Sequence, residues 1–257
     1  MKIRVLTLFP AMFDGFATTS IIKRAIGKGI VDFQAVDIRS YTKDKYNRTD
    51  TAPIGGGAGL VQKCQPIVDC IKANGGDSAH KILLSPRGKT YKEEDAVRLS
   101  KMDSIMLICG HFEGIDERVN DYVDELISIG DYILTGGEIP SMAIADSVIR
   151  LLDGAIAKES LDDESFSDGA LEYPQYTEPY DYDGKKVPAI LYSGNHEAIA
   201  KWRRKQSLLL TRKYRPDLFA KLTLSKQDKK LLLEADSEQE PEWERKAIEK
   251  GKAFMKE

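Results

Sequence analysis

The chain has 257 residues, of which 42% are hydrophobic and 31% charged, with a formal net charge of −3 at pH 7. This length allows one large domain or two modest ones, and the composition is ordinary for a soluble globular protein. The net charge gives no general argument for nucleic-acid binding, no apolar run approaches membrane-spanning length, and no leader pattern follows Met1.

Short apolar runs that predict buried strands alternate with patterns of helical period. The predicted strands are residues 3–9, 33–38, 82–84, 105–108 and 125–129. The predicted helices among and after them are residues 12–25, 66–73, 92–100 and 139–152. This alternation is typical of an α/β domain with a largely parallel sheet covered by helices.

Residues 153–187 show no sustained period and are rich in tyrosine and proline. Between Lys158 and Asp183 there are nine acidic residues and one basic residue. The segment is therefore predicted to be a long linker or an ordering loop. It divides the chain into a predicted α/β domain at 1–157, an acidic linker at 158–187 and a helical domain at 188–257.

Helical period returns in the last part of the chain. The predicted helices are residues 196–214, opened by the capping residues Ser193 and Asn195, and then 216–222, 226–234 and 242–256. From Lys201 to Lys230 there are eleven Lys or Arg residues against two Asp. Such a basic block favours a phosphate-binding surface, with a solvated helix face as the alternative.

Three glycine-bearing loops follow predicted strands, at residues 83–89, 108–118 and 128–140. Each is compatible with a tight connection between strand and helix. Glycine also lets backbone approach a ligand closely, and open α/β sheets bind ligands at the carboxyl edge of their strands. The three loops together predict one composite binding site.

Common nucleotide-binding motifs are absent. Residues 85–90 imitate the end of a P-loop, but the first glycine of that motif would fall on Leu83. The first strand leads into Phe9-Pro10 and not into a glycine-rich dinucleotide turn. The glycine run at 55–59 is predicted to be flexible or to contact the substrate.

The histidines and cysteines predict no metal centre or nucleophile. His80, His111 and His196 are too scattered for a metal cage, although His111 is placed to touch a ligand or to be structural. The cysteines follow no metal or redox spacing, which favours a reduced, cytoplasmic setting. Cys109 is predicted to pack as a small hydrophobic side chain.

Four long motifs stand at Gly110–Arg118, Ser128–Glu138, Leu171–Thr177 and Ser193–His196. Together with Phe9-Pro10 and the glycine loop they closely resemble the bacterial tRNA (guanine-N1)-methyltransferases, in the same order over nearly the whole chain. The resemblance implies an S-adenosylmethionine-dependent enzyme of the SPOUT class. It also implies a trefoil-knotted α/β domain with a parallel sheet, a smaller helical C-terminal domain and a homodimer.

The resemblance further implies that the three loops bind the methyl donor. Adenine requires an apolar slot with backbone hydrogen bonds to its edge, which the loop at 129–134 offers. Phe112 stands where many relatives have tyrosine, so a hydroxyl contact is lost there. The implied cofactor-binding residues are Leu84, Ser85, Pro86, Gly110, Phe112, Glu113, Ser128, Ile129, Gly130, Asp131, Tyr132, Ile133, Leu134, Gly136, Gly137 and Pro140.

The family methylates N1 of guanosine 37, immediately 3′ of the tRNA anticodon. N1 carries a proton that a base must remove, while negative charge shifts towards O6 and requires a cationic partner. The resemblance assigns Arg150 to the developing oxyanion and Glu164 to the base, where relatives commonly have aspartate. Asp163 and Asp168 stay as alternatives after a small change of register.

The resemblance implies that the helical domain binds the tRNA anticodon stem-loop. Glu178 stands where the family usually has arginine, which removes a cation near the RNA. Trp202 is predicted to pack within its helix. The basic residues predicted to hold phosphate are Lys201, Arg203, Arg204, Lys205, Arg212, Lys213 and Arg215.

Family members depend on Mg²⁺ for transfer, but no dedicated carboxylate cage is visible, so an ion is expected near the linker acids and the substrates. Two alternative functions stay open. One is a SPOUT-like methyltransferase acting on another RNA, and the other is a catalytically silent RNA-binding dimer. Arg150 and an acid in the linker favour activity over binding alone.

Overall fold

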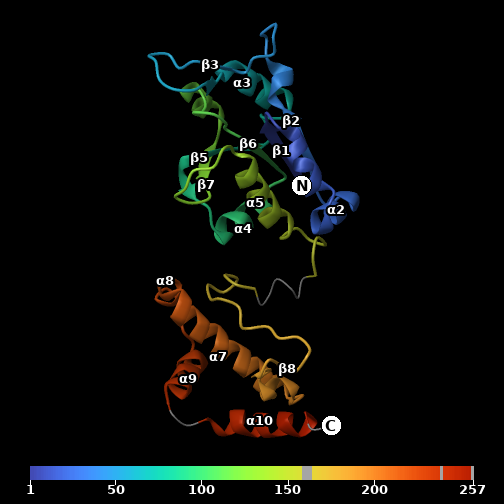
Figure 1. The fold of residues 1–257 in the computed structure, drawn as a ribbon, viewed down its shortest axis with the longest axis vertical. Coiled ribbons are helices and arrows are strands. Elements are labelled where there is room, and N and C mark those ends of the chain that lie inside the picture. The colour runs from blue at the N-terminus through green and yellow to red at the C-terminus, as the bar shows by residue number, and fades with distance from the viewer. Residues whose placement is uncertain (158–163, 238–239, 256–257) are drawn as a thin grey trace. The chain divides into compact units, whose positions relative to one another are not determined.

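The computed structural model describes residues 1–157, 164–237 and 240–255 (Figure 1). The chain divides into two compact units, Met1–Lys158 and Glu159–Glu257. Two hydrophobic clusters lie within the first unit and a third within the second. None of the helices that the structure describes is long and apolar enough to cross a bilayer.

Five parallel strands form the sheet of the first unit. They are β1 (Lys2–Thr7), β2 (Asp32–Asp37), β5 (His80–Thr90), β6 (Ser104–Ile108) and β7 (Glu125–Ser128). Their order across the sheet is β2-β1-β6-β5-β7, and Val5 lies opposite Ala35 of β2 and Leu107 of β6. The α/β class and the parallel sheet predicted from the sequence are confirmed.

Alternate residues of these strands face two separate hydrophobic layers, as expected of strands buried on both faces. On β1, Val5 packs into one layer and Leu6 into the other. On β6, Leu107 and Ile108 divide in the same way. All four side chains are fully buried, so the apolar runs read from the sequence are the centre of the core.

Helices cover both faces of the sheet. The first layer contains side chains of α2 (Ser20–Gly27), α4 (Glu93–Ser100) and α5 (Glu138–Ile149). The second contains side chains of α3 (Cys64–Ala73) and the 3₁₀ helix η3 (Glu117–Tyr122), and Figure 1 shows α3 on the side opposite α4 and α5. The remaining short elements of this unit are η1 (Pro10–Phe13), α1 (Asp14–Ala17), η2 (Ile38–Tyr41), β3 (Asp50–Thr51) and β4 (Val61–Gln62).

The prediction of one helix at residues 12–25 is wrong, because the chain there forms η1, α1 and α2 in succession. Thr19 is extended at φ −121° and ψ 145°, and its hydroxyl donates to the Gly15 carbonyl. Thr18 bonds the Asp14 carbonyl in the same way. Hydroxyl side chains that bond nearby backbone favour helix ends, which explains the break.

Strand β5 is longer than the predicted strand at 82–84. Its register against β7 shifts between Leu84 and Lys89, so the intervening residues form an irregularity within the strand. At Gly88 a Cβ atom would lie 2.4 Å from the Ile127 nitrogen, so glycine allows the two backbones to meet. The segment that imitates a P-loop is thus part of a bulged strand.

The second unit contains the long helix α7 (His196–Tyr214), whose predicted bounds are confirmed. Asn195 caps it by accepting a hydrogen bond from the Ala198 N–H at 3.2 Å. Among the described residues of this unit, the other elements are β8 (Asp181–Tyr182), β9 (Lys185–Lys186), η4 (Ala189–Tyr192), α8 (Pro216–Phe219), α9 (Lys226–Asp236) and α10 (Glu242–Phe254).

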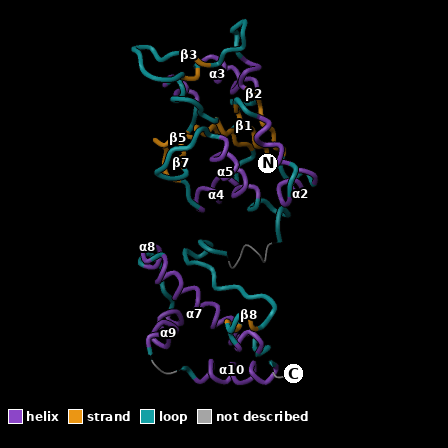
Figure 2. The backbone as a smooth tube through the Cα atoms, in the orientation of Figure 1, coloured by secondary structure: helices purple, strands orange, loops and turns teal. Residues whose placement is uncertain are grey.

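The described part of the acidic segment, residues 164–187, packs against α7. The Leu171 N–H donates to the Thr211 hydroxyl at 2.8 Å, and the Ser207 hydroxyl donates to the Leu171 carbonyl at 2.6 Å. Figure 2 shows most of this segment as loop, interrupted by β8 and β9. Polar side chains of α7 therefore fix the backbone of a segment that has no helical period.

Helix α10 completes the hydrophobic cluster of the second unit. Trp202 of α7 and Ala247 of α10 are 6% and 2% exposed, and Trp243 of α10 packs beside them. The prediction that Trp202 packs is confirmed. Gly251 faces η4 so closely that a Cβ atom would lie 1.8 Å from the Ala189 carbonyl oxygen.

Candidate active site

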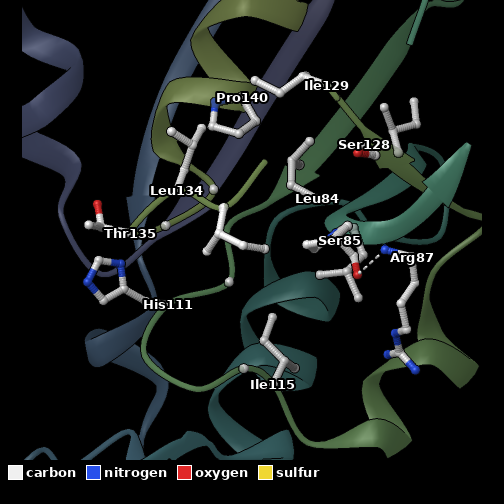
Figure 3. A pocket seen from close by; sticks show the side chains of 18 of the residues that line it. Leu84, Ser85, Arg87, His111, Ile115, Ser128, Ile129, Leu134, Thr135 and Pro140 are labelled. Atoms are coloured by element: carbon white, nitrogen blue, oxygen red, sulfur yellow. Dashed lines mark hydrogen bonds between the residues drawn. The ribbon is translucent and has the colours of Figure 1, made fainter. Parts of the chain in front are cut away.

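A cavity of about 560 Å³, here called the loop cavity, lies where the segments that follow β6 and β7 meet the bulge of β5. Ligand sites of α/β sheets occur at this edge, and small-molecule pockets have volumes of this order. Figure 3 shows the side chains of Leu84, Ile129, Leu134 and Pro140 grouped in it. The cavity therefore offers an apolar wall surrounded by glycine-rich backbone.

Fifteen of the sixteen residues predicted to bind the cofactor line the loop cavity. They are Leu84, Ser85, Pro86, Gly110, Phe112, Glu113, Ser128, Ile129, Gly130, Tyr132, Ile133, Leu134, Gly136, Gly137 and Pro140. Asp131 is not among the lining residues. The structure thus brings together three segments that the sequence places up to 56 residues apart, counted from Leu84 to Pro140.

Glycine backbone joins two of these segments. The Gly137 N–H donates to the Gly110 carbonyl at 2.9 Å, and His111 forms an antiparallel bridge with Gly136. A Cβ atom on Gly137 would lie 2.7 Å from the Cα atom of Cys109. Because the nearest atom belongs to the backbone, the close approach requires glycine at this position.

Gln62 supports the loop after β6 and was not predicted from the sequence. Its side-chain oxygen accepts from the His111 backbone N–H at 3.0 Å, and its backbone N–H donates to the Gly114 carbonyl at 2.9 Å. Gln62 is 1% exposed, so both bonds are shielded from water. The only sequence signal is its position shortly after the glycine run at 55–59.

A buried carboxylate lies behind the cavity. Glu138 at the start of α5 is 2% exposed and accepts a hydrogen bond from the Thr7 hydroxyl at 2.7 Å. The Nδ1 atom of His111 lies 3.7 Å from its other oxygen. The His111 ring also lines the loop cavity and packs between Phe9 and Phe112, with centroids 4.8 and 4.9 Å away. His111 therefore packs within the structure and also lines the cavity, so its contact with a ligand stays a prediction.

Cys109 packs as predicted. It is 1% exposed, and its sulfur lies 3.1 Å from the Ser141 hydroxyl. Burial raises the pKa of its thiol far above the ordinary value, with the Glu138 carboxylate adding to the effect. A thiol of this kind stays protonated and is not a nucleophile.

The predicted catalytic residues lie in different units. Arg150 caps the end of α5 in the first unit, and Glu164 lies in the second. Their cooperation therefore stays a prediction. Of the alternatives, Asp163 lies outside the described residues, and the Asp168 carboxylate pairs with Arg204 of α7.

Glu164 lines a second cavity, of about 420 Å³, here called the linker cavity. A third cavity, of about 370 Å³, is called the tyrosine cavity. Tyr173, Ile199 and Arg203 line both and form the wall between them. Glu178, the departure noted in the sequence, lines the tyrosine cavity.

Most basic side chains of α7, and Arg215 directly after it, have acidic partners within the second unit, which the sequence did not indicate. Arg204 also binds Asp228 and holds the pKa of that carboxyl below its ordinary value through this hydrogen bond. The pairs with their shortest distances are Lys201–Glu197 (2.6 Å), Arg204–Asp228 (2.8 Å), Lys205–Glu244 (2.6 Å), Arg212–Asp236 (2.8 Å) and Arg215–Asp217 (2.8 Å). Five of the seven residues predicted to hold phosphate are therefore already paired with carboxylates.

Within the described residues, no group of three or more His, Cys, Asp or Glu side chains could hold a metal ion. Two acidic residues that line the loop cavity instead pair with arginines. Glu117 receives two hydrogen bonds of 3.0 Å from Arg87, and Asp116 pairs with Arg118. These carboxylates consequently belong to salt bridges.

Comparison with known proteins places the chain in a family. Residues 1–221 match the sequence model of the family described as tRNA (Guanine-1)-methyltransferase TrmD. A protein of Clostridium perfringens type A, named tRNA (guanine-N(1)-)-methyltransferase, is 53% identical over 234 residues, covering 90% of this chain and 99% of its own. The similarly named protein of Clostridium botulinum strain Hall is 52% identical over 234 residues, covering 90% of this chain and 97% of its own. The chain therefore belongs to the tRNA (guanine-1)-methyltransferase family.

Proposed function

We propose that this chain transfers the methyl group of S-adenosylmethionine to N1 of guanosine 37 in tRNA. Family membership supports the proposal, and the names of the relatives specify a tRNA, a guanine and the N1 position. The observation that carries it is the loop cavity, because fifteen residues predicted to hold the methyl donor meet there. With tRNA as the substrate and no disulfide spacing, the proposed location is the cytoplasm.

The residues around the loop cavity suit S-adenosylmethionine. Leu84, Ile129 and Leu134 provide apolar walls for an adenine ring, and backbone at Gly110 and Gly136 can approach the polar edges of the ligand. When bound, S-adenosylmethionine supplies an electrophilic methyl group on a sulfonium. The glycine-bearing loops after β6 and β7 would hold the donor beside these apolar side chains.

We further propose that the first unit has the trefoil knot of SPOUT enzymes. β7 is an edge strand, and the following helix α5 packs against α4 and also reaches β1 and α2 further across the sheet. The chain between them must pass back across the ends of the central strands. The hydrogen bond between Gly137 and Gly110 lies on this path and supports a threaded connection.

Glu164 and Arg150 carry the proposed chemistry. The donor held in the loop cavity would supply the methyl carbon, which would bond to N1 of guanine as its bond to sulfur breaks. Glu164 accepts the proton that N1 loses, and the Arg150 guanidinium stabilises the negative charge that shifts towards O6. The end of α5 positions the Arg150 backbone, whose N–H donates to the Asp146 carbonyl at 3.0 Å.

A homodimer and a requirement for Mg²⁺ complete the proposal. Tyr132, Ile133 and Ile139, at or next to the loop cavity, are 54%, 81% and 51% exposed and offer apolar surface to a second copy of the chain. Mg²⁺ would enter with the substrates, since oxygen atoms of RNA are suitable ligands for it.

Unmodified tRNA transcripts and S-adenosylmethionine with a labelled methyl group test the proposed function. We expect label in transcripts with guanosine at position 37 and none in transcripts with adenosine there. Digestion to nucleosides should give 1-methylguanosine. Label in another RNA only would support the broader SPOUT-like alternative, and RNA binding without label would support a silent dimer; either result contradicts the proposal.

Replacing Gly137 by Ala is expected to weaken S-adenosylmethionine binding about tenfold or more, because the new methyl group would collide with the Cys109 backbone. Calorimetric titration measures the change. The matched control is Gly27→Ala in α2, where a Cβ atom meets nothing within 4 Å. Equal affinity of the two variants would show that the loop cavity does not hold the donor.

A further inference from the structure

The tyrosine cavity lies in the second unit and has no role in the chemistry described so far. Its walls include Tyr173, Tyr176 and Tyr192 together with the apolar side chains of Val187 and Leu191. Tyr176 keeps 44% of its surface exposed, so a ligand can reach its ring from solvent. Planar aromatic and apolar walls are typical of pockets that receive an unstacked nucleobase.

Arg203 differs from the other arginines of α7. Its guanidinium lies over the Tyr173 ring, 4.7 Å from the centroid, and has no acidic partner among the described residues. Its Nε atom is buried and, within the described part of the chain, has no hydrogen-bond partner. The cavity therefore has an arginine stacked on tyrosine with one hydrogen-bond donor unused.

The charge of the tyrosine cavity distinguishes a base from a phosphate. Glu178 lines the same cavity as Arg203, so a carboxylate and a guanidinium border it together. A phosphate would be attracted by one and repelled by the other. A neutral nucleobase carries both donors and acceptors on its edge and satisfies both groups.

We propose that the tyrosine cavity receives one unpaired nucleobase of the substrate RNA, next to the target guanosine. The proposal rests on the proposed function, because it takes its RNA from there. Tyr173 and Arg203 separate this cavity from the linker cavity, which contains Glu164. A base held on one side of this wall positions the neighbouring nucleotide on the side of the carboxylate that accepts the proton.

The test measures RNA affinity by fluorescence anisotropy, with the full chain and an anticodon stem-loop RNA. Each unpaired loop nucleotide is replaced in turn by an abasic residue. We expect one abasic position beside the target to weaken wild-type binding about 5- to 150-fold, the range of base–aromatic stacking. In the Tyr176→Ala and Arg203→Ala variants the same abasic substitution should have little further effect, because the pocket is already lost.

Tyr214→Ala is the matched control, since Tyr214 of α7 is 61% exposed and does not line the cavity. It should keep the full abasic effect. Arg203→Lys retains the charge without the planar group and should behave like Arg203→Ala. The proposal would be overturned if, at every abasic position, the losses of affinity caused by the RNA change and by the protein variant simply added. It would also be overturned if the variants bound the intact RNA as tightly as the wild type. In Arg203→Ala, the slope of the logarithm of the binding constant against the logarithm of salt concentration could become shallower by about 0.7–0.9 while the abasic effect is retained. That result would identify a phosphate contact instead and also overturn the proposal. Methylation of tRNA by the wild type is measured separately, so failure of the proposed function can be told apart from failure of the proposal for the tyrosine cavity.

Discussion

Replacing Glu164 by Gln is expected to lower the rate of methyl transfer about 10²- to 10⁴-fold, the usual contribution of a general base. The amide has nearly the same shape as the carboxylate but cannot accept the N1 proton. Glu164 lies in the second unit, whereas the loop cavity is formed by the first, so S-adenosylmethionine affinity should not change. Single-turnover assays with labelled donor measure the rate, and calorimetry measures the affinity.

Asp168→Asn is the informative comparison for Glu164→Gln. The Asp168 carboxylate lines the linker cavity too, but it pairs with Arg204 and accepts a hydrogen bond from the Ala170 N–H at 3.0 Å. We expect this variant to lose much less activity. If Glu164→Gln turned over at a near-normal rate, the proton would go to another acid, and a severe loss in Asp168→Asn would identify Asp168 as that acid.

Replacing Gly251 by Ala is expected to lower the free energy of unfolding of the second unit by about 2–3 kcal/mol. Within a helix, Ala is ordinarily more favourable than Gly by about 1 kcal/mol, so helix propensity alone predicts stabilisation. Here a Cβ atom would lie 1.8 Å from the Ala189 carbonyl oxygen, and α10 would have to move away from η4. The sign of the change therefore reveals whether this contact exists.

Tryptophan fluorescence measures the effect of Gly251→Ala selectively. The chain has two tryptophans, Trp202 and Trp243, and both pack in the cluster that α10 completes. Urea titration followed by their emission thus reports on the second unit. The control is Lys252→Ala on the exposed face of α10, expected within about 0.5 kcal/mol of the wild type. A variant with Ala at 251 that is as stable as this control would show that α10 does not press on η4.

Periodic hydrophobicity in the sequence predicted the helices and strands in which buried residues recur at a regular spacing. The strands at β1 and β6 alternate between two core layers, and α7 begins at a capping asparagine, so hydrophobicity and capping were enough. The helix at 12–25 was predicted wrongly because Thr18 and Thr19 use their hydroxyls on the local backbone, a competition that hydrophobic period does not reveal.

In the candidate site too, features with a local sequence signal were predicted and contacts between distant residues were not. Glycine-rich loops after strands are local signals, and they indicated the composite cavity before its geometry was known. Contacts made over long sequence separations left no such signal. Thr7 bonds Glu138 across 131 residues, and Lys205 pairs with Glu244 across 39. The sequence therefore indicated a basic block that favours phosphate binding, but it did not reveal that partners distant in sequence, such as Asp228, Asp236 and Glu244, pair with three of its residues.

Helix α10 has a consequence for exchanging parts between this protein and its relatives. The family match ends at residue 221, yet Trp243, Ala247 and Ile248 lie in one cluster with Trp202. A chimera cut at the family boundary would join a foreign C-terminal end to an apolar surface shaped for these side chains. Successful recombination would need Trp202 and the residues of η4 to be transferred together with the helix that covers them.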